Sequence, residues 1–235
     1  FVLGLQGPCA TYDTACSATL VACHGALRAM QLHECGDGLV AGASLMLVPG
    51  PSALVAAAGM TSPRGRCHTF DSRADGFARG EGCCAAVVVL GQDDDRATTS
   101  VLGSSVMCDG RSASLTAPNG QAQRDLLRAA LADAGVDPAS LSRMEAHGTG
   151  TALGDPIEAG SLAGAVLSSR GEASPALPVG SVKANSGHAK PAAGISGLQV
   201  AMTDALGVDV LQGLVRGRGR VRGRGWGRGW GRGRG

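Results

Sequence analysis

The chain has 235 residues, of which 44% are hydrophobic, enough apolar material for one large domain or two small ones. Eight of its 21 Lys and Arg residues lie in 216–235, where no acidic residue occurs, so residues 1–215 have a net charge of −6. This mildly acidic body offers no electrostatic case for nucleic acid, and no apolar run is long enough to span a membrane. We therefore expect neither a membrane nor a nucleic acid as partner.

The eight cysteines show no CxxC pair and no spacing with histidine that is typical of a zinc site. We expect free, mostly buried thiols and no metal site. The cysteines are Cys9, Cys16, Cys23, Cys35, Cys67, Cys83, Cys84 and Cys108.

Cys16 lies at the beginning of the first predicted helix. Residues 17–32 (SATLVACHGALRAMQL) have apolar side chains along one face, and the preceding TYDTA favours a strand. A cysteine at a helix N-terminus lies at the positive end of the helix dipole, which lowers the pKa of the thiol and favours the thiolate. Cys16 is therefore a candidate nucleophile, and a buried structural cysteine is the alternative.

A long polar loop separates the next predicted elements. Residues 38–48 predict a buried strand, and residues 52–60 a short helix with Ser52 as its N-cap. Residues 62–82 (SPRGRCHTFDSRADGFARGEG) show no helical or strand period, and a loop of this length is usually functional or tightly packed. Residues 83–90 (CCAAVVVL) predict a fully buried strand, and a further strand is predicted at 99–108.

The second half of the chain contains the clearest helix. It is predicted over 121–141, where leucine and alanine residues make one apolar face and Gly135 supplies a C-terminal stop. Another helix is predicted over 155–167, with Asp155 as its N-cap and Pro156 in its first turn.

Two short predicted strands each lead to a histidine. Residues 143–146 run into His147, and residues 178–184 lead to His188, after which a helix of small residues is predicted from 192 to 206. Taken alone, each histidine also fits a structural role, at the surface or as a helix cap.

Strand and helix predictions alternate along most of the chain, which is typical of an α/β fold with a mainly parallel sheet. Cys16, His147 and His188 each come directly after a predicted strand. Ligands and chemistry in such sheets lie outside the carboxyl ends of the strands. This placement of three reactive side chains indicates a functional site at that edge.

Four motifs, in this order and spacing, resemble those of the β-ketoacyl synthases, or ketosynthases: DTACSA, FDSRADGFARGEG, EAHGTGTALGDPIEA and VGSVKANSGHAKPAAGISGL. The third is most similar to ketosynthase domains of modular polyketide synthases and multidomain fatty-acid synthases. The resemblance covers residues 1–207. It implies a partial ketosynthase domain with the thiolase-like layered α/β fold, in which the sheets are mainly parallel.

The resemblance implies an acyltransferase that carries out a decarboxylative Claisen condensation in fatty-acid or polyketide synthesis. Cys16 corresponds to the nucleophile that holds the acyl chain, and His147 and His188 to the histidines that promote loss of CO2 from a malonyl thioester and stabilise the enolate. Lys183 corresponds to a supporting lysine in a charged network. The family needs no bound cofactor: its partner is an acyl carrier protein bearing phosphopantetheine, and the full domain is a homodimer.

The motifs also assign weaker roles. Thr149 and Thr151 are expected to contact the pantetheine arm. Asp71, Asp75 and Glu81 belong to the second motif and are expected to fix its loop, not to act as acids or bases. The remaining histidines match no catalytic motif and are expected to be structural or exposed: His24, His33 and His68.

The chain departs from the family pattern at both ends. Little sequence precedes Cys16, and no Gly-Phe-Gly-Gly turn, which helps to form the family's oxyanion hole, follows His188. Ser186 and Pro191 are atypical for their positions. We therefore expect a domain that is incomplete at both ends, with an inactive ketosynthase fragment as the alternative. A thiolase on the same fold is disfavoured, because His188 lies in an NSGH segment after a lysine.

Residues 208–235 are expected to form a low-complexity Arg/Gly tail outside the domain. Its sequence VRGRGRVRGRGWGRGWGRGRG alternates Gly with Arg, Val or Trp. The tail is expected to be disordered, or to be an artefact that translates a G-rich nucleotide repeat. A nucleic-acid-binding RG tail is a further alternative.

Overall fold

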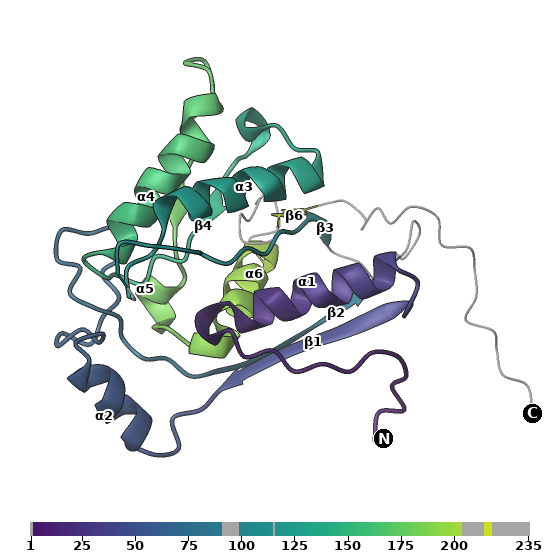
Figure 1. Ribbon diagram of the computed structural model, residues 1–235, viewed down its shortest axis with the longest axis horizontal. Coiled ribbons are helices and arrows are strands. Elements are labelled where there is room, and N and C mark those ends of the chain that lie inside the picture. The colour runs from purple at the N-terminus through teal and green to yellow at the C-terminus, as the bar shows by residue number, and fades with distance from the viewer. Residues whose placement is uncertain (1, 91–98, 115, 204–213, 218–235) are drawn as a thin grey trace, which may run out of the picture.

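The computed structural model describes residues 2–90, 99–114, 116–203 and 214–217. Helices lie beside short sheets in an α/β arrangement (Figure 1). The α-helices are α1 (Ala18–Gln31), α2 (Gly50–Ala57), α3 (Gly120–Ala134), α4 (Gly154–Ala165), α5 (Lys183–Ser186) and α6 (Ala193–Thr203). The strands are β1 (Asp37–Ser44), β2 (Gly82–Val89), β3 (Thr99–Gly103), β4 (Met144–Glu145), β5 (Val179–Gly180) and β6 (Leu214–Gly217). The 3-10 helices include η1 (Ala15–Ser17) and η4 (Lys190–Ala192).

The described strands pair in twos. β1 and β2 are antiparallel, with Asp37 opposite Val89 and Ser44 opposite Gly82. β3 and β6 are also antiparallel, whereas β4 and β5 are parallel. The expectation of mainly parallel pairing is therefore wrong for these strands. Alternation of strands and helices along the sequence predicts that helices connect the strands. It does not determine whether two neighbouring strands pair in parallel or antiparallel.

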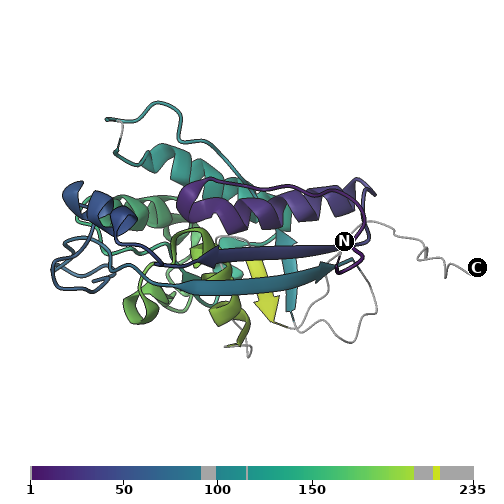
Figure 2. The ribbon, with the colours of Figure 1, turned by 90° about the horizontal axis from the view of Figure 1, so that it is seen from below.

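Helices α1 and α6 cover one face of the β1–β2 sheet (Figures 1 and 2). The apolar core between them contains Cys23, Leu27, Met30, Val40, Val88 and Ile195. On the opposite face of this sheet, Leu39 is 46% and Val87 is 69% exposed. The prediction that residues 83–90 are fully buried is therefore wrong, because successive side chains of a strand point to opposite faces and the described elements cover only one of them.

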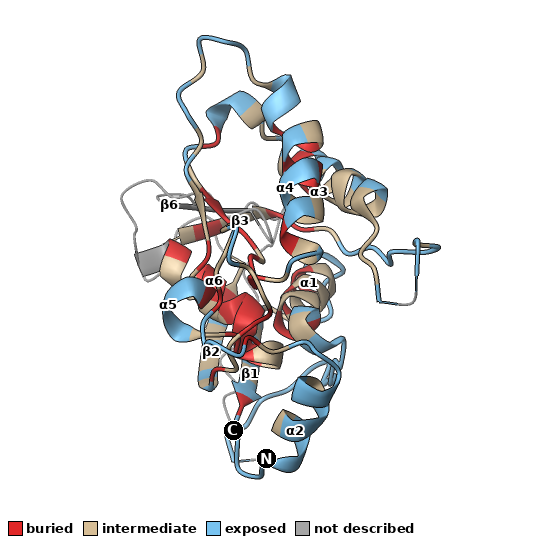
Figure 3. Ribbon diagram, turned by 90° about the vertical axis from the view of Figure 1, so that its left-hand side faces the viewer, coloured by how far each residue is buried: buried red, intermediate tan, exposed pale blue. Residues whose placement is uncertain are grey.

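A second core joins α3 and α4 to β4. Its buried members are Ala130, Leu131, Leu141, Met144, Leu162, Ala165 and Val166. Buried residues gather on α6 and along α3 and α4, whereas α2 is mostly exposed (Figure 3).

The predicted helices at 17–32, 121–141, 155–167 and 192–206 are confirmed as α1, α3, α4 and α6. Helix α3 ends at Ala134, where Gly135 follows with a left-handed φ of 62°, as its residue type predicts. Asn119 caps the start of α3 by accepting hydrogen bonds from the N–H groups of Gln121 and Ala122.

Two predicted N-caps are wrong. Helix α2 begins at Gly50 without a side-chain cap, and Ser52 lies inside it, where its Oγ accepts a hydrogen bond from the Arg79 guanidinium. Asp155 lies in the first turn of α4, and its carboxylate accepts from N–H groups of the preceding loop. Sequence identifies a polar residue near a helix start, but tertiary contacts decide which N–H groups it serves.

The predicted strands are shorter than expected, and one is missing. Residues 11–15, before Cys16, form no strand, and β3 ends at Gly103. The strand predicted at 178–184 is β5, after which the chain turns into α5. Most of the expected tail at 208–235 lies outside the described residues. The part of it that is described, Leu214–Gly217, forms β6.

All eight cysteines are free, as predicted, but only Cys23 and Cys67 are buried. Cys9, Cys83 and Cys108 are exposed, so the expectation of mostly buried thiols is wrong. Among the helices that the structure describes, none is long and apolar enough to cross a membrane.

Candidate active site

Folding brings Cys16, His147 and His188 together from three separate segments. The Cys16 Sγ and one nitrogen of each imidazole all lie within 4.8 Å of one another. Cys16 comes from η1, His147 follows β4, and His188 follows α5. The three candidate catalytic residues of the sequence therefore share one site.

Cys16 lies in a tight turn ahead of α1. Ala15 has a left-handed backbone with a φ of 53°, which is uncommon for a residue with a side chain. Ser17 supports the turn by donating from Oγ to the carbonyl oxygen of Thr14 at 2.9 Å. In this turn the Cys16 Sγ lies 2.9 Å from Nε2 of His188.

The pKa of the Cys16 thiol is raised, not lowered as the helix position alone predicts. Burial is the largest cause, and it outweighs the positive charges of Lys190 and Lys183, which lower the pKa. The expectation of an intrinsically acidic thiol is therefore wrong. A thiol of this kind needs a neighbouring base to become a nucleophile, and the His188 imidazole lies within hydrogen-bonding distance.

His188 is the most enclosed member of the triad, with 1% of its surface exposed. Its backbone N–H donates to the Ala78 carbonyl oxygen at 2.7 Å, and its own carbonyl oxygen accepts from Gly80 N at 3.0 Å. The Phe77 ring packs edge-on against the imidazole at 5.2 Å between centroids. Burial lowers the pKa of His188 to about 3, with smaller effects from His147, Lys183 and Lys190.

His147 is held through its backbone by the half-buried carboxylate of Glu158. Glu158 accepts the N–H of His147 at 2.6 Å and that of Gly148 at 2.8 Å. The two imidazole rings lie 5.5 Å apart and nearly perpendicular. Burial, followed by the charge of Lys183, lowers the pKa of His147 to about 4. Both imidazoles are thus neutral near pH 7, and each can present one N–H and one lone pair.

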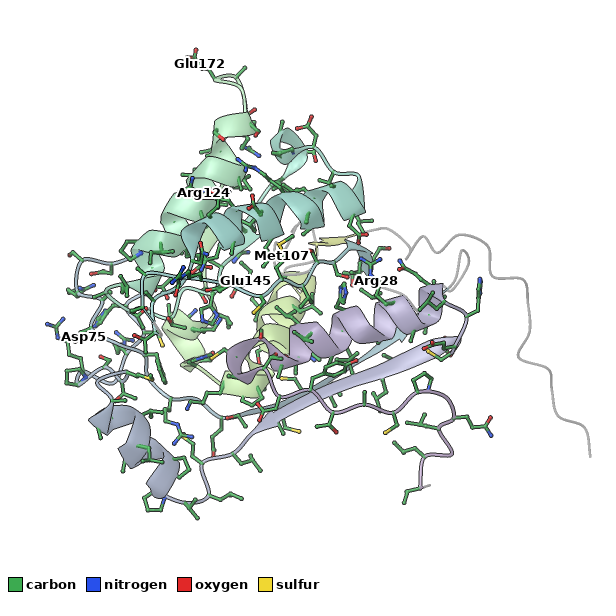
Figure 4. The ribbon with its side chains drawn as sticks, in the orientation of Figure 1. Arg28, Asp75, Met107, Arg124, Glu145 and Glu172 are labelled. Atoms are coloured by element: carbon green, nitrogen blue, oxygen red, sulfur yellow. The ribbon has the colours of Figure 1, made fainter. Side chains whose placement is uncertain are left out.

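Lys183 is buried beside the triad, with 4% of its surface exposed. Burial lowers the pKa of its ammonium group, while the carboxylates of Glu145 and Glu158 act in the opposite direction. Glu145 also accepts the Val182 N–H at 2.7 Å. The charged network around Lys183 therefore contains the buried Glu145, labelled in Figure 4, and the half-buried Glu158.

The loop with Thr149 and Thr151 is shaped by Asp155. This carboxylate accepts from Gly150 N at 3.0 Å, Thr151 N at 3.1 Å and Phe70 N at 2.8 Å. The Thr151 hydroxyl accepts from Gly154 N at 3.1 Å, and Thr149 is buried. Contact of these threonines with a pantetheine arm stays a prediction.

Three carboxylates of the site are missed by the sequence patterns, which single out neither Glu145 nor Glu158 and assign Asp155 only as a helix cap. Their signal is in the motif EAHGTGTALGDPIEA, which contains all three. Asp155 and Glu158 are three residues apart on one helix and therefore share a face. That face meets the backbone of the His147 loop.

The acidic residues of the second motif make the loop contacts expected of them. Asp71 binds Arg73 at 2.7 Å, Asp75 binds Arg64 at 3.4 Å, and Glu81 accepts the Met46 N–H. The remaining histidines lie outside the triad: His24 Nδ1 is 2.8 Å from the Ser104 hydroxyl, His33 is exposed, and His68 has a buried Nε2.

The three side chains of the triad also lie close enough together to hold a metal ion. Among the described residues, this is the group of His, Cys, Asp or Glu side chains with such an arrangement. Sequence spacing shows nothing of it, because the three residues meet only on folding. Lys183 and Lys190 both act electrostatically on Cys16, and two nearby cations oppose a bound divalent cation. We therefore interpret the triad as a nucleophile with two neutral acid–base and hydrogen-bonding groups.

Comparison with protein families decides the relationship. The N-terminal domain of β-ketoacyl synthases matches residues 1–95, and the C-terminal domain of β-ketoacyl synthases matches residues 98–210. The chain belongs to the β-ketoacyl synthase family. The ketosynthase resemblance of the four motifs is confirmed, with Cys16 in the N-terminal part and both histidines of the triad in the C-terminal part.

Curated ketosynthase relatives are much longer than this chain. Over 208 residues it is 49% identical to a phenolphthiocerol/phthiocerol polyketide synthase protein of Mycobacterium tuberculosis, a match that covers 86% of this chain and 9% of the relative. Over 203 residues it is 47% identical to another protein of the phenolphthiocerol/phthiocerol polyketide synthase, from Mycobacterium bovis, covering 84% of this chain and 11% of the relative. The chain thus spans about a tenth of these relatives.

Solved ketosynthase structures share the fold. The ketosynthase from module 6 of the bacillaene synthase of Bacillus subtilis superposes with a TM-score of 0.83 at 36% identity, covering 92% of this chain and 39% of that one. An oxazolomycin ketosynthase domain of Streptomyces albus gives a TM-score of 0.82 at 34% identity, covering 89% and 37%. The predicted thiolase-like α/β fold is confirmed.

Proposed function

We propose that this chain carries the acyl-transfer and condensation site of a polyketide-synthase ketosynthase. The observation that carries the proposal is the convergence of one thiol and two neutral imidazoles within 4.8 Å. The substrates are an acyl thioester and a malonyl-type thioester. The names of the matched relatives, which belong to polyketide synthases, favour polyketide over fatty-acid synthesis.

The first half-reaction is acyl transfer to Cys16. His188 Nε2, 2.9 Å from Sγ, accepts the thiol proton as Sγ attacks the carbonyl carbon of the acyl thioester. The carbon–sulfur bond of the incoming thioester breaks, and its thiol leaves with a proton. The product is an acyl-Cys16 thioester, with both imidazoles neutral again.

The second half-reaction is condensation. The malonyl-type thioester loses CO2, and the two electrons of the broken carbon–carbon bond form an enolate. The enolate oxygen accepts hydrogen bonds from an N–H of His147 and from His188 in the tautomer that is protonated at Nε2, because each neutral imidazole can donate one hydrogen bond. The enolate carbon attacks the acyl-Cys16 carbonyl, and the bond between that carbonyl carbon and Sγ breaks. The Cys16 thiolate leaves and takes up a proton from water, and a β-ketoacyl thioester is released.

Burial and the surrounding charges keep the two histidines neutral. Burial is the largest cause of the lowered pKa of both imidazoles, and the charge of Lys183 acts in the same direction. An imidazole that is neutral at rest keeps the lone pair that accepts the thiol proton, and His188 carries a positive charge only until that proton passes to the leaving thiol. Lys183 is therefore a supporting residue and takes no part in bond making.

The acyl groups would be delivered by an acyl carrier protein through its phosphopantetheine arm, and no cofactor would be bound by the domain itself. Thr149 and Thr151 lie on the His147 loop and are the proposed contacts of that arm. The complete domain would be a homodimer, as the family resemblance implies.

The test uses the chain with an acyl thioester and follows its intact mass. We expect one acyl group per chain, located on Cys16 by fragment-ion mass spectrometry, and none on the Cys16→Ala variant. Addition of a malonyl carrier protein should then release the acyl group as a β-ketoacyl product. Condensation by the Cys16→Ala variant, or acylation confined to other cysteines, would overturn the mechanism.

The alternatives gain no support from the described residues or the comparisons. The Arg/Gly segment at 218–235, on which a nucleic-acid-binding role depends, lies outside the described residues. An inactive fragment makes the opposite forecast in the acylation test, namely no transfer to Cys16 at any pH.

A further inference from the structure

Lys190, two residues after His188, has an unusual backbone conformation. Its φ is 43°, in the left-handed region that residues with side chains rarely adopt. The following residue is Pro191, which restricts the preceding residue to extended conformations in most proteins. A conformation that opposes two local preferences must be held by contacts elsewhere, and such strain is concentrated at functional sites.

The contacts that hold Lys190 come from the start of α1, beside Cys16. Thr19 donates from Oγ1 to the Pro191 carbonyl oxygen at 2.8 Å, and the same hydroxyl accepts the Ile195 N–H at 3.1 Å. Thr19 is buried and lies one turn after Cys16. The segment that carries Lys190 is thus fastened to the helix that follows the nucleophile.

The Lys190 side chain turns toward the triad. Its Nζ lies over the Phe77 ring, 5.9 Å from the ring centroid, within the range of a cation–π contact. The same ring packs edge-on against His188, whose Nε2 is 2.9 Å from the Cys16 Sγ. A half-buried cation is therefore anchored on the aromatic ring that borders the catalytic pair.

The charges around Cys16 differ in how far they are compensated. His147 and His188 are neutral, and Lys183 faces Glu145 and Glu158. Among the described residues neither lysine makes an ion pair with a carboxylate, but the charges of Glu145 and Glu158 act on Lys183. Among the charges that lower the pKa of Cys16, Lys190 has the largest effect, followed by Lys183.

We propose that Lys190 is a positioning residue of this site, whose charge, held over the Phe77 ring, stabilises the Cys16 thiolate as the thiol proton passes to His188. The inference rests on the proposed function and extends it, because the four motifs assign a supporting charge only to Lys183. A cation anchored on Phe77 offsets part of the burial penalty on the thiolate at the point where acyl transfer needs a nucleophile.

The test is the pH dependence of Cys16 alkylation by iodoacetamide in the full chain, located by fragment-ion mass spectrometry. In the Lys190→Met variant, Cys16 should be alkylated about threefold to tenfold more slowly near neutral pH, and the midpoint of the pH profile should move upward. A rise of up to about one unit in the pKa of the thiol produces a change of this size. Lys190→Arg should restore the profile. Arg111→Met, which removes an exposed cation elsewhere, is the matched control and should leave it unchanged.

The result that overturns the inference is an unchanged profile in a folded Lys190→Met variant, or a loss that Lys190→Arg fails to restore. The proposed function fails separately, if the unmodified chain takes no acyl group on Cys16 although that thiol alkylates normally. Circular dichroism of each variant shows whether the fold is retained.

Discussion

The Sγ atom of Cys16 lies 2.9 Å from Nε2 of His188, although the two residues are 172 positions apart in the sequence. The contact depends on three attachments: the turn at Ala15, the backbone hydrogen bonds of His188 to the Ala78–Gly80 segment, and the clamp of Thr19 on Pro191. Each attachment offers a way to move one partner without removing it.

Replacing His188 by Ala should slow acylation of Cys16 about 100-fold or more, because the thiol loses the base that accepts its proton. The time course of acylated intact mass measures this rate. His24→Ala is the control, since His24 contacts Ser104 away from the triad. Acylation of His188→Ala at the unmodified rate would show that another group removes the proton.

Glu158→Gln should lower the free energy of unfolding by about 1–3 kcal/mol, because an amide offers one acceptor oxygen where two N–H groups, of His147 and Gly148, must be satisfied. Urea unfolding followed by circular dichroism measures the change. Glu172→Gln, at the exposed tip beyond α4 (Figure 4), should leave the midpoint within experimental error. Equal midpoints for the two variants would contradict this role of Glu158.

Gly80→Ala should impair acylation more than it impairs folding. A Cβ at this position would lie 2.6 Å from the Ser186 carbonyl oxygen and 3.3 Å from His188 N, so the His188 segment must shift. Overpacking of this kind costs about 1–3 kcal/mol. Gly171→Ala, where a Cβ would meet nothing within 4 Å, is the matched control. Equal acylation rates for the two variants would contradict the prediction that a shift of the His188 segment impairs acylation.

Acidification should destabilise the fold through the two buried histidines. Their pKa values are about 4 for His147 and about 3 for His188, below the unfolded value of 6.5, so the unfolded chain binds more protons between these limits. The stability they contribute is complete above pH 6.5 and is lost as pH falls toward 3, with a slope of up to about 1.4 kcal/mol per pH unit for each histidine.

The raised pKa values of Glu145 and Glu158 have the opposite effect: above their unfolded pKa of 4.5, they make the free energy of unfolding rise as pH falls. The effect of the histidines is therefore measured by comparing the unmodified chain with a histidine variant. The free energy of unfolding of the double variant His147→Asn/His188→Asn should depend less steeply on pH between 6.5 and 4 than that of the unmodified chain. His33→Asn, at an exposed position, should retain the steeper dependence. Equal slopes for the double variant and the unmodified chain would contradict the prediction.

Sequence alone determined the local elements and the family of this protein. The apolar period of residues 17–32, the glycine after Ala134 and the four motifs act over a few residues, and α1, α3 and the family match confirm what they predict. Sequence also identified the three residues that the structure brings within 4.8 Å.

Tertiary structure alone decided the electrostatics and the neighbours. Burial raises the pKa of Cys16 against the helix dipole, and no local pattern reports how much water a thiol loses on folding. The grip of Glu158 on the His147 loop, the antiparallel return of β2 and the place of Lys190 over Phe77 all join segments distant in the chain. Such contacts depend on how whole elements pack, which periodicity and residue type do not encode.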